Sequence, residues 1–447
     1  MAKFFITWCL AIASVATGVA GARSVPKLDQ NEWWGPPELM MNTEELQQRK
    51  CIRPWSLTIS QDEIDYLRWR LLDHHSFAPA LEDSNFEYGF NPDQLDDWAQ
   101  YWANEYNFTR AEQVLNQYPQ YKVNVQGLDI HFIWIKPEVP KGVKTVPLLM
   151  LHGWPSSVRA YHDSIPILTT PNKGLAFEVI IPSLPGFGFS DAAVRPGLGP
   201  AQMAVVFKNL MKTLGHKKFY VQGEDWGAVI GRQLATLYQN DILGFHSTQL
   251  SILSNCEEIK TFLAGYIAIL QVELQQFNRT ATTELLEETG FMHLQATKPD
   301  SVGVGLSDSP IGLCAWMLEK FSTWTRRDNR LLVDGGLLNH FTRDQLLDNV
   351  MVYWLSNSMT SAMRIYAEYF SNAQRALGIE QIPTKVPVWN IRPIHELLPS
   401  AQNEIKFPNF VGTTILDAGH FVFFEQPEAV AKDIFKAVKA FRSYRKW

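Results

Sequence analysis

Short apolar runs that alternate with helical patterns are the feature of this chain that most restricts its fold. Four runs have the character of buried strands: Val146–Leu151, Phe177–Ser183, Phe219–Gln222 and Phe245–Leu250. Strands that alternate with helices form parallel sheets, because each crossover helix packs back onto the sheet. The pattern therefore predicts an α/β fold with a doubly wound, mostly parallel sheet.

Two further patterns complete the predicted sheet. The alternating runs Tyr121–Gly127 and Leu128–Lys136 indicate an antiparallel hairpin at its edge. The strand pattern then stops for the largely helical residues 251–378 and returns at Val386–Arg392 and Gly412–His420. A helical block between two sheet-forming blocks predicts a lid over the C-terminal ends of the strands, where open α/β sheets bind ligands.

The chain is expected to have five parts, in this order: an N-terminal membrane anchor or signal segment (1–23), a helical extension (24–120), a first part of the core (121–250), the helical lid (251–378) and a second part of the core (379–447). One helix of the extension is predicted to start at the capping box Ser60–Glu63 and to run to Leu72.

Composition narrows the class of protein and of partner. Hydrophobic residues make up 46% of the 447 residues and aromatic residues 12%, which is sufficient for a large folded core. The net charge of −6 comes from interspersed signs without a long run of Lys and Arg, so we expect no nucleic-acid partner. Four cysteines are too few for a disulfide scaffold.

The N-terminus carries an uncharged apolar segment, Phe4–Ala22. Its length of roughly 19 residues is just enough to cross a bilayer as a helix. Its second half is rich in small residues, and Ala20–Ala22 resembles a signal-peptidase site. We expect an uncleaved membrane anchor, with a cleaved signal peptide as the alternative.

The turn after the third apolar run has the clearest chemical meaning. Residues 223–227 read Gly-Glu-Asp-Trp-Gly, which is the G-x-S-x-G nucleophile elbow with Asp225 in the place of the serine. An ionised aspartate attacks without a base, but it is weak and needs a carbon with a strained or good leaving group, as in an epoxide or haloalkane. The product is an ester of Asp225 that water must cleave. Taken alone, the turn also fits an aspartate that only caps a helix.

Cleavage of that ester requires a base and a group that orients it. His420 follows the last strand pattern and Glu396 follows the strand before it, which is the α/β-hydrolase order of nucleophile, acid and histidine. Glu257, just after the run that ends at Leu250, is a competing acid. His395 is a rival base, but it adjoins the predicted acid and is not expected to face the nucleophile.

The sequence His-Gly-Trp-Pro at residues 152–155 directly follows a strand, at the position of the second oxyanion loop. Backbone N–H groups of Trp154, next to Gly153, and of Trp226 are the predicted donors to the Asp225 carboxylate and to the later tetrahedral oxyanion. His152 is expected to bond to the backbone and to shape this loop.

Together these motifs resemble the microsomal-type epoxide hydrolase family, which includes the juvenile hormone epoxide hydrolases. The resemblance covers almost everything after the N-terminal segment. Its motifs are WWGP (33–36), GLDIHFI (127–133), HGWP (152–155), GEDWG (223–227), TKPDSVGVGLSDSP (297–310), LEKFSTWT (318–325), HELL (395–398) and AGHFVFFEQPE (418–428).

The resemblance implies an α/β-hydrolase fold with an inserted helical lid and an N-terminal wrapping extension. It implies hydrolysis of apolar terpenoid or foreign epoxides to vicinal diols, with water and without metal or cofactor. Asp225, Glu396 and His420 correspond to the family's nucleophile, acid and histidine, and Tyr366 to one of two lid tyrosines that polarise the epoxide oxygen. Tyr369 is expected to be a packing residue. The family also implies an anchor in the membrane of the endoplasmic reticulum, with secretion as the second choice for this chain.

The sequence departs from the family at two positions. Glu224 stands where the family usually has glycine, and its carboxylate either points into solvent or disturbs the ionisation of Asp225. Phe291 stands where the second lid tyrosine is expected, and it keeps the ring without the hydrogen-bond donor. We expect slower epoxide opening, unless Tyr266 or Tyr353 supplies the missing donor.

Two alternative functions are open at this point. A haloalkane dehalogenase would share the aspartate nucleophile and could use Trp226 as a halide donor. A catalytically weakened binder of lipid-like ligands is suggested by Phe291. The intact set of Asp225, Glu396 and His420 argues against a pure binder, because binding alone does not require these residues.

Overall fold

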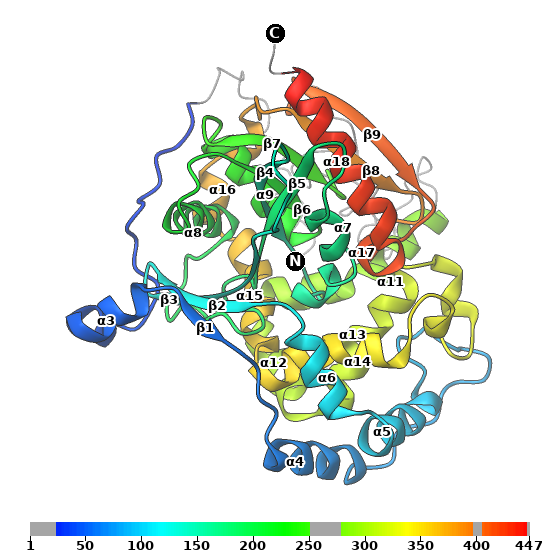
Figure 1. Cartoon of the computed structure of the whole chain (residues 1–447). Helices are drawn as coiled ribbons and strands as arrows, with labels where there is room; N and C mark the ends of the chain where they lie inside the picture. Colours follow the sequence, from blue (N-terminus) through cyan, green and yellow to red (C-terminus); the bar gives the residue numbers. More distant parts are fainter. Residues whose placement is uncertain (1–23, 251–278, 397–404, 445–447) are drawn as a thin grey trace, which may run out of the picture.

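A central sheet organises the chain, as the computed structural model in Figure 1 shows for residues 24–250, 279–396 and 405–444. Within these residues the sheet has nine strands in the order β1-β2-β3-β5-β4-β6-β7-β8-β9. The strands are β1 (Arg53–Trp55), β2 (Gln120–Val125), β3 (Leu128–Ile135), β4 (Lys144–Leu151), β5 (Leu175–Pro182), β6 (Phe219–Gly223), β7 (Ile242–Ser247), β8 (Val388–Pro393) and β9 (Phe410–Leu416). Every pair from β5 to β9 is parallel, which confirms the predicted α/β fold.

The antiparallel edge of the sheet differs from the prediction by one strand. Strands β2 and β3 form the expected hairpin, with Val125 paired to Leu128. The edge itself is β1, which pairs antiparallel with β2 and comes from a stretch without strand alternation. Pro54 lies in the middle of β1, and proline has no backbone N–H, so this sequence suits an edge strand only.

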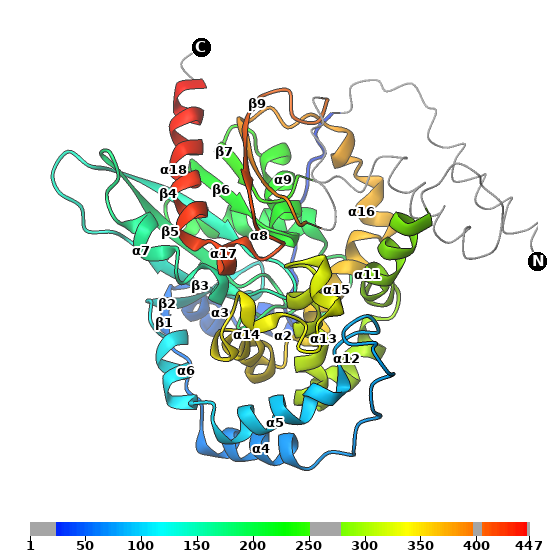
Figure 2. The same ribbon diagram turned by 90° about the vertical axis from the view of Figure 1, so that its right-hand side faces the viewer.

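Helices cover both faces of the sheet (Figures 1 and 2). One face carries α8 (Pro200–Thr213) and α9 (Trp226–Leu237), and the other carries α7 (Ile165–Thr169), α17 (Val422–Glu425) and α18 (Pro427–Tyr444). Successive residues of β6 point to opposite faces, as in any strand. Tyr220 stacks on Phe441 of α18, whereas Val221 faces Gly231 of α9.

The described residues between β7 and β8 form helices and no strand. They are α11 (Arg279–Thr297), α12 (Pro299–Asp308), α13 (Pro310–Thr323), η4 (Arg327–Leu331), η5 (Leu337–Asn339), α14 (Arg343–Ser356), α15 (Met359–Tyr369), α16 (Asn372–Ala376) and η6 (Ile379–Gln381). This helical block lies beyond the C-terminal end of β6, which is the end that carries Asp225 (Figure 1).

Before β2, the N-terminal extension contains α2 (Pro37–Met41), α3 (Thr43–Lys50), α4 (Gln61–Leu72), η2 (Pro92–Gln94), α5 (Leu95–Asn104) and α6 (Phe108–Leu115). The extension packs against this helical block through α4, α5 and α6, and against the sheet through β1 and α3. Helices α4 and α5 contact α13, and α6 contacts α14 (Figure 1). Helix α4 begins at the predicted capping box, in which Ser60 and Glu63 each accept from the other's backbone N–H.

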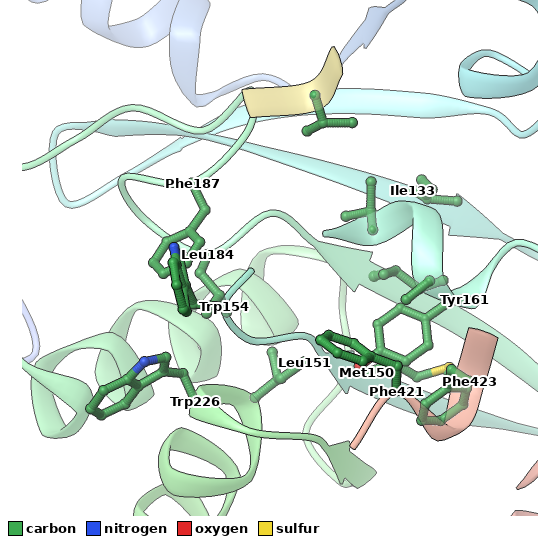
Figure 3. Close-up of a cluster of buried hydrophobic side chains, with 14 of the residues drawn as sticks. Ile133, Met150, Leu151, Trp154, Tyr161, Leu184, Phe187, Trp226, Phe421 and Phe423 are labelled. Atoms are coloured by element: carbon green, nitrogen blue, oxygen red, sulfur yellow. The ribbon is translucent and has the colours of Figure 1, made fainter. Parts of the chain in front are cut away.

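The apolar core continues from the sheet to the residues around Asp225. Figure 3 shows Tyr161 of η3 (Val158–Tyr161) beside Phe423, and Trp154 and Trp226 at the other end of the same cluster. Both indoles are buried, which fixes the two backbone segments that flank Asp225.

In the parts of the chain that the structure describes, no helix combines the length and apolar character needed to cross a membrane. The predicted anchor, Phe4–Ala22, lies outside the described residues.

Candidate active site

Asp225 lies at a sharp turn between the end of β6 and the start of α9. Its backbone has φ of +48° and ψ of −122°, a conformation that non-glycine residues rarely adopt and that is retained mainly at functional sites. The two glycines of the motif permit the turn. A Cβ atom on Gly223 would lie 2.3 Å from the Gly227 carbonyl oxygen, and one on Gly227 would lie 1.9 Å from that of Leu151.

The carboxylate of Asp225 is held by backbone amides of the predicted oxyanion loop. The N–H of Trp154 donates to Oδ1 at 2.8 Å. A Cβ atom on Gly153 would lie 2.1 Å from the same oxygen, so only glycine leaves room for the carboxylate here. Burial raises the pKa of Asp225, while His420 and the N–H groups of Trp154 and Trp226 favour the ionised form. The loop and the start of α9 therefore each offer one donor to a negative charge at this position.

His420 lies between Asp225 and Glu396. Its Nε2 is 3.7 Å from Oδ2 of Asp225, and its Nδ1 is 2.9 Å from Oε2 of Glu396. Burial alone would lower the pKa of the imidazole, but the charges of Glu396, Asp225 and Glu224 outweigh it and raise this pKa to about 9. In the free site at neutral pH, His420 is thus an imidazolium flanked by carboxylates.

The other histidines considered from the sequence, His395 and His152, contact groups other than Asp225. His395 is partly exposed, and its Nε2 is 2.9 Å from Oδ1 of Asp417. His152 is buried, and it shapes the loop as expected: Nδ1 contacts the Gly153 carbonyl oxygen at 3.1 Å and Nε2 accepts from the Leu184 N–H at 3.2 Å. Glu257, the competing acid, lies outside the described residues.

A mainly apolar cavity opens in front of Asp225. Its described lining residues are Asp225, Trp226, Val229, Arg232, Gln249, Thr289, Phe291, Met292, Trp324, Tyr366, Tyr369, Phe370, Glu396 and His420. Apolar and aromatic side chains that surround a few polar groups are typical of sites for apolar small molecules. The cavity can thus place an apolar substrate against the Asp225 carboxylate.

Aromatic rings surround Tyr366, the predicted donor to the epoxide oxygen. The ring of Tyr366 packs edge-on against Trp226 at 4.6 Å and Phe291 at 5.9 Å between centroids. Burial and the charge of Asp225 raise the pKa of the Tyr366 phenol well above its usual value, so the phenol keeps its proton as a donor. Phe291 offers only its ring to the cavity.

Tyr353, one of the two proposed substitute donors, does not fill the position of the missing phenol. Tyr353 donates its hydroxyl proton to the Ser156 carbonyl oxygen at 2.7 Å, and it does not belong to the described lining of the cavity. The expectation that Tyr353 could replace the donor is therefore wrong. Tyr266 lies outside the described residues. Tyr369, expected only to pack, packs against Trp226 and also lines the cavity.

Comparison with known proteins identifies the family. Residues 52–161 match the family model described as epoxide hydrolase N terminus, and residues 146–282 match that of the alpha/beta hydrolase fold. The juvenile hormone epoxide hydrolase of Bombyx mori is 48% identical over 431 residues, which cover 94% of this chain and 92% of that protein. The chain belongs to the epoxide hydrolase family.

Further epoxide hydrolases are also similar to this chain in sequence and in structure. Epoxide hydrolase 1 of Oryctolagus cuniculus is 39% identical over 425 residues, 92% of each chain. The crystal structure of the Bombyx mori juvenile hormone epoxide hydrolase matches with a TM-score of 0.86 at 48% identity, over 94% of this chain and 100% of that chain. Aspergillus niger epoxide hydrolase, at 23% identity and a TM-score of 0.71, shares the fold. These relatives do not favour the haloalkane dehalogenase or the pure binder.

This member of the epoxide hydrolase family has a buried acid beside Asp225. Sequence reasoning left the direction of Glu224 open, and the structure places its side chain in the interior, where the Ser156 hydroxyl donates to it at 3.2 Å. Burial, followed by the charge of Asp225, raises the pKa of Glu224 to about 8, even though His420 acts in the opposite direction. At neutral pH, Glu224 is therefore mostly protonated.

Some residues that line the cavity were not predicted as site residues from the sequence. Trp324 was quoted only as part of a motif, yet it packs against His420 at 4.9 Å between centroids. Val229 and Arg232 of α9 also line the cavity without having been predicted. Their spacing from Asp225, four and seven residues along a helix that starts at the nucleophile, is the signal that could have identified them.

Proposed function

We propose that this chain hydrolyses an apolar epoxide to a vicinal diol through an ester of Asp225. The observation that carries the proposal is the position of the Asp225 carboxylate in a hydrophobic cavity. Its Oδ1 accepts from the Trp154 N–H at 2.8 Å, and its Oδ2 lies 3.7 Å from Nε2 of His420. The membership of the chain in the epoxide hydrolase family supports the choice of substrate class.

In the first step, Oδ2 of Asp225 attacks an epoxide carbon, and the ring C–O bond breaks. Tyr366 donates its phenolic proton to the oxygen that leaves the carbon. The phenolate then recovers a proton from solvent. A carboxylate nucleophile suits this step because ring strain makes the epoxide oxygen a leaving group that needs little activation.

In the second step, Nε2 of His420 removes a proton from water, and the hydroxyl adds to the carboxyl carbon of the ester. The N–H groups of Trp154 and Trp226 stabilise the tetrahedral oxyanion. The C–O bond to the diol breaks, the diol oxygen takes the proton from His420, and the carboxyl group of Asp225 releases its proton to solvent and becomes a carboxylate again. Esterification removes the charge of Asp225, which lowers the pKa of His420 and favours the neutral base.

The substrate class follows from the cavity and the relatives. Relatives with 48% and 41% identity are named juvenile hormone epoxide hydrolases. The cavity is lined mainly by apolar and aromatic side chains. We therefore propose a terpenoid epoxide of the juvenile hormone type as the preferred substrate over smaller foreign epoxides. The test is a competition experiment in which a terpenoid epoxide and a smaller foreign epoxide are present in one reaction and both diols are measured. Faster hydrolysis of the foreign epoxide would contradict the proposal.

We also propose that Phe4–Ala22 holds the protein at the membrane of the endoplasmic reticulum. Its uncharged length supports an anchor, and a cleaved signal peptide remains the second choice. Mass spectrometry of the N-terminus of the expressed protein tests this. A mature chain that begins near Arg23 would establish cleavage.

A single turnover in ¹⁸O-labelled water tests the chemistry. With enzyme in excess over the epoxide, the first diol should carry an unlabelled oxygen from Asp225, and the label should enter the carboxylate of that residue. His420→Gln should accumulate the ester on the peptide that contains Asp225, and Asp225→Ala should form none. Labelled diol in the first turnover would instead establish direct attack by water.

A further inference from the structure

The side chain of Trp226 carries an N–H group that the two-step mechanism does not use. Trp226 follows the nucleophile directly, is 6% exposed and lines the cavity in front of Asp225. Its Nε1 is buried and has no hydrogen-bond partner among the described residues. An indole N–H can only donate, and a buried donor without an acceptor destabilises the folded state. A step of the reaction that brings an acceptor to this N–H is therefore favoured by it.

The phenol of Tyr366 is the acceptor that this N–H faces. The rings of Trp226 and Tyr366 lie 4.6 Å apart between centroids, with planes at 85°. Phe291 and Trp154 lie farther from the Tyr366 ring, at 5.9 Å and 6.0 Å. Burial and the charge of Asp225 raise the pKa of the phenol, and hydrogen bonding from the indole acts in the opposite direction. Hydrogen bonds of a catalytic site are often long in the free enzyme and shorten in the reacting complex.

The oxygen of Tyr366 becomes a stronger acceptor in the first step of the proposed mechanism. When Tyr366 gives its proton to the epoxide oxygen, a phenolate forms in a buried and mainly apolar site. Phe291, at the position of the second lid tyrosine, has no hydroxyl group with which to share this proton donation. Hydrogen bonds to a charged acceptor are about twice as strong as those between neutral groups. A donor to the Tyr366 oxygen therefore favours transfer of the proton to the epoxide.

We propose that the indole of Trp226 is a positioning residue for epoxide opening, whose N–H donates to the Tyr366 oxygen and stabilises the phenolate. The indole keeps its own proton, and only the O–H bond of Tyr366 breaks. Because the phenol oxygen accepts from the indole, its hydroxyl proton is turned away from Trp226 and toward the cavity. Trp226 thus supports the one phenol at this position, and its indole does not touch the epoxide.

The test is a double-mutant cycle on the rate at which Asp225 is alkylated in single turnovers, and it rests on the proposed function. Trp226→Phe removes the indole N–H and should slow alkylation about tenfold, which is less than the factor of about 10²–10³ for a donor that touches the oxyanion itself. Tyr366→Phe keeps the ring that packs against Trp226 and removes only the hydroxyl. In that background, Trp226→Phe should slow alkylation no further, because the acceptor is gone. Decay of the ester should be unchanged in Trp226→Phe, because the backbone N–H of residue 226 remains.

A second background separates the hydrogen bond from packing. Tyr369 also packs against Trp226, at 5.3 Å between centroids, so in Tyr369→Phe the change Trp226→Phe should keep its full effect on alkylation. A loss of packing alone would slow alkylation equally in the parent and in Tyr366→Phe. That result, or an unchanged rate in Trp226→Phe, with an ester that still forms in the parent enzyme, would overturn this inference alone. If the parent enzyme forms no ester, the proposed function itself fails.

Discussion

The ring of Phe291 stacks on the indole of Trp154, with centroids 5.3 Å apart and planes 10° from parallel. Phe291 is 8% exposed, and the ammonium of Lys320 lies 4.9 Å from its ring centroid. A ring held in this way lies nearly perpendicular to the ring of Tyr366, with centroids 5.9 Å apart. Phe291 thus preserves the shape of the position at which the resemblance predicts a second phenol, and it lacks only the hydroxyl group.

Phe291→Tyr should accelerate epoxide opening by about tenfold, because a second phenol would donate to the developing alkoxide. The measurement is the rate at which Asp225 is alkylated in single turnovers. Phe291→Leu, which removes the ring that stacks on Trp154, is the matched control and should slow alkylation. An unchanged rate in Phe291→Tyr would mean that another donor already serves the oxygen.

Tyr366→Phe should slow alkylation by about 10²–10³, the usual cost of losing a donor to an oxyanion. Decay of an ester that has already formed should change little, because Tyr366 takes no part in the water step. Tyr369→Phe is the control, since Tyr369 lines the same cavity and packs against Trp226. Equal losses in the two variants would count against Tyr366 as the proton donor.

Gly153→Ala should slow ester formation strongly without unfolding the protein. The added Cβ would lie 2.1 Å from Oδ1 and 2.3 Å from Cβ of Asp225, so the carboxylate would have to leave the Trp154 N–H. A loss of about 10²–10³ in the alkylation rate is expected, as for a lost oxyanion donor. Gly290→Ala in α11 is the control, because its added Cβ meets no atom within 4 Å.

Glu224→Gln should stabilise the protein more at pH 8 than at pH 5. The pKa of Glu224 is raised to about 8 in the folded state, so folding becomes less favourable as the pH rises from the unfolded pKa near 4.5 to about 8. Glutamine has no such dependence. Its advantage should therefore grow with pH, by about 2–4 kcal/mol between pH 5 and 8. Urea unfolding of the variant and the parent protein at several pH values measures this difference in the free energy of unfolding. A difference that does not change with pH would contradict the burial of an ionisable Glu224.

The sequence was sufficient for the strands of the core and for the elbow, because both depend on local patterns. The direction of Glu224 was not accessible, since it depends on the φ of +48° at the next residue and on the approach of the Ser156 loop. The hydrogen bond from Tyr353 to Ser156 joins residues 197 positions apart, and no local pattern encodes it. Strand β1 was missed because three residues are too few for an alternation to be recognised.

Asp348→Asn should destabilise the protein strongly, because Asp348 connects the N-terminal extension with the helical block. Its carboxylate is fully buried and accepts from Arg110 at 2.7 Å and from Tyr106 at 2.8 Å, and Arg159 lies 3.6 Å away. Removing the charge leaves the buried guanidinium of Arg159 without its closest buried partner. Loss of one member of a buried ion pair typically costs about 3–5 kcal/mol.

Urea unfolding of Asp348→Asn and of Glu428→Gln, measured side by side, tests this role. Glu428 pairs with Lys432 on the surface, where both side chains are largely exposed, so its loss should change the free energy of unfolding little. A cost for Asp348→Asn as small as that of Glu428→Gln would mean that the extension and the helical block hold together without this buried charge. A large cost with unchanged single-turnover alkylation at low temperature would place Asp348 in folding rather than in the chemistry.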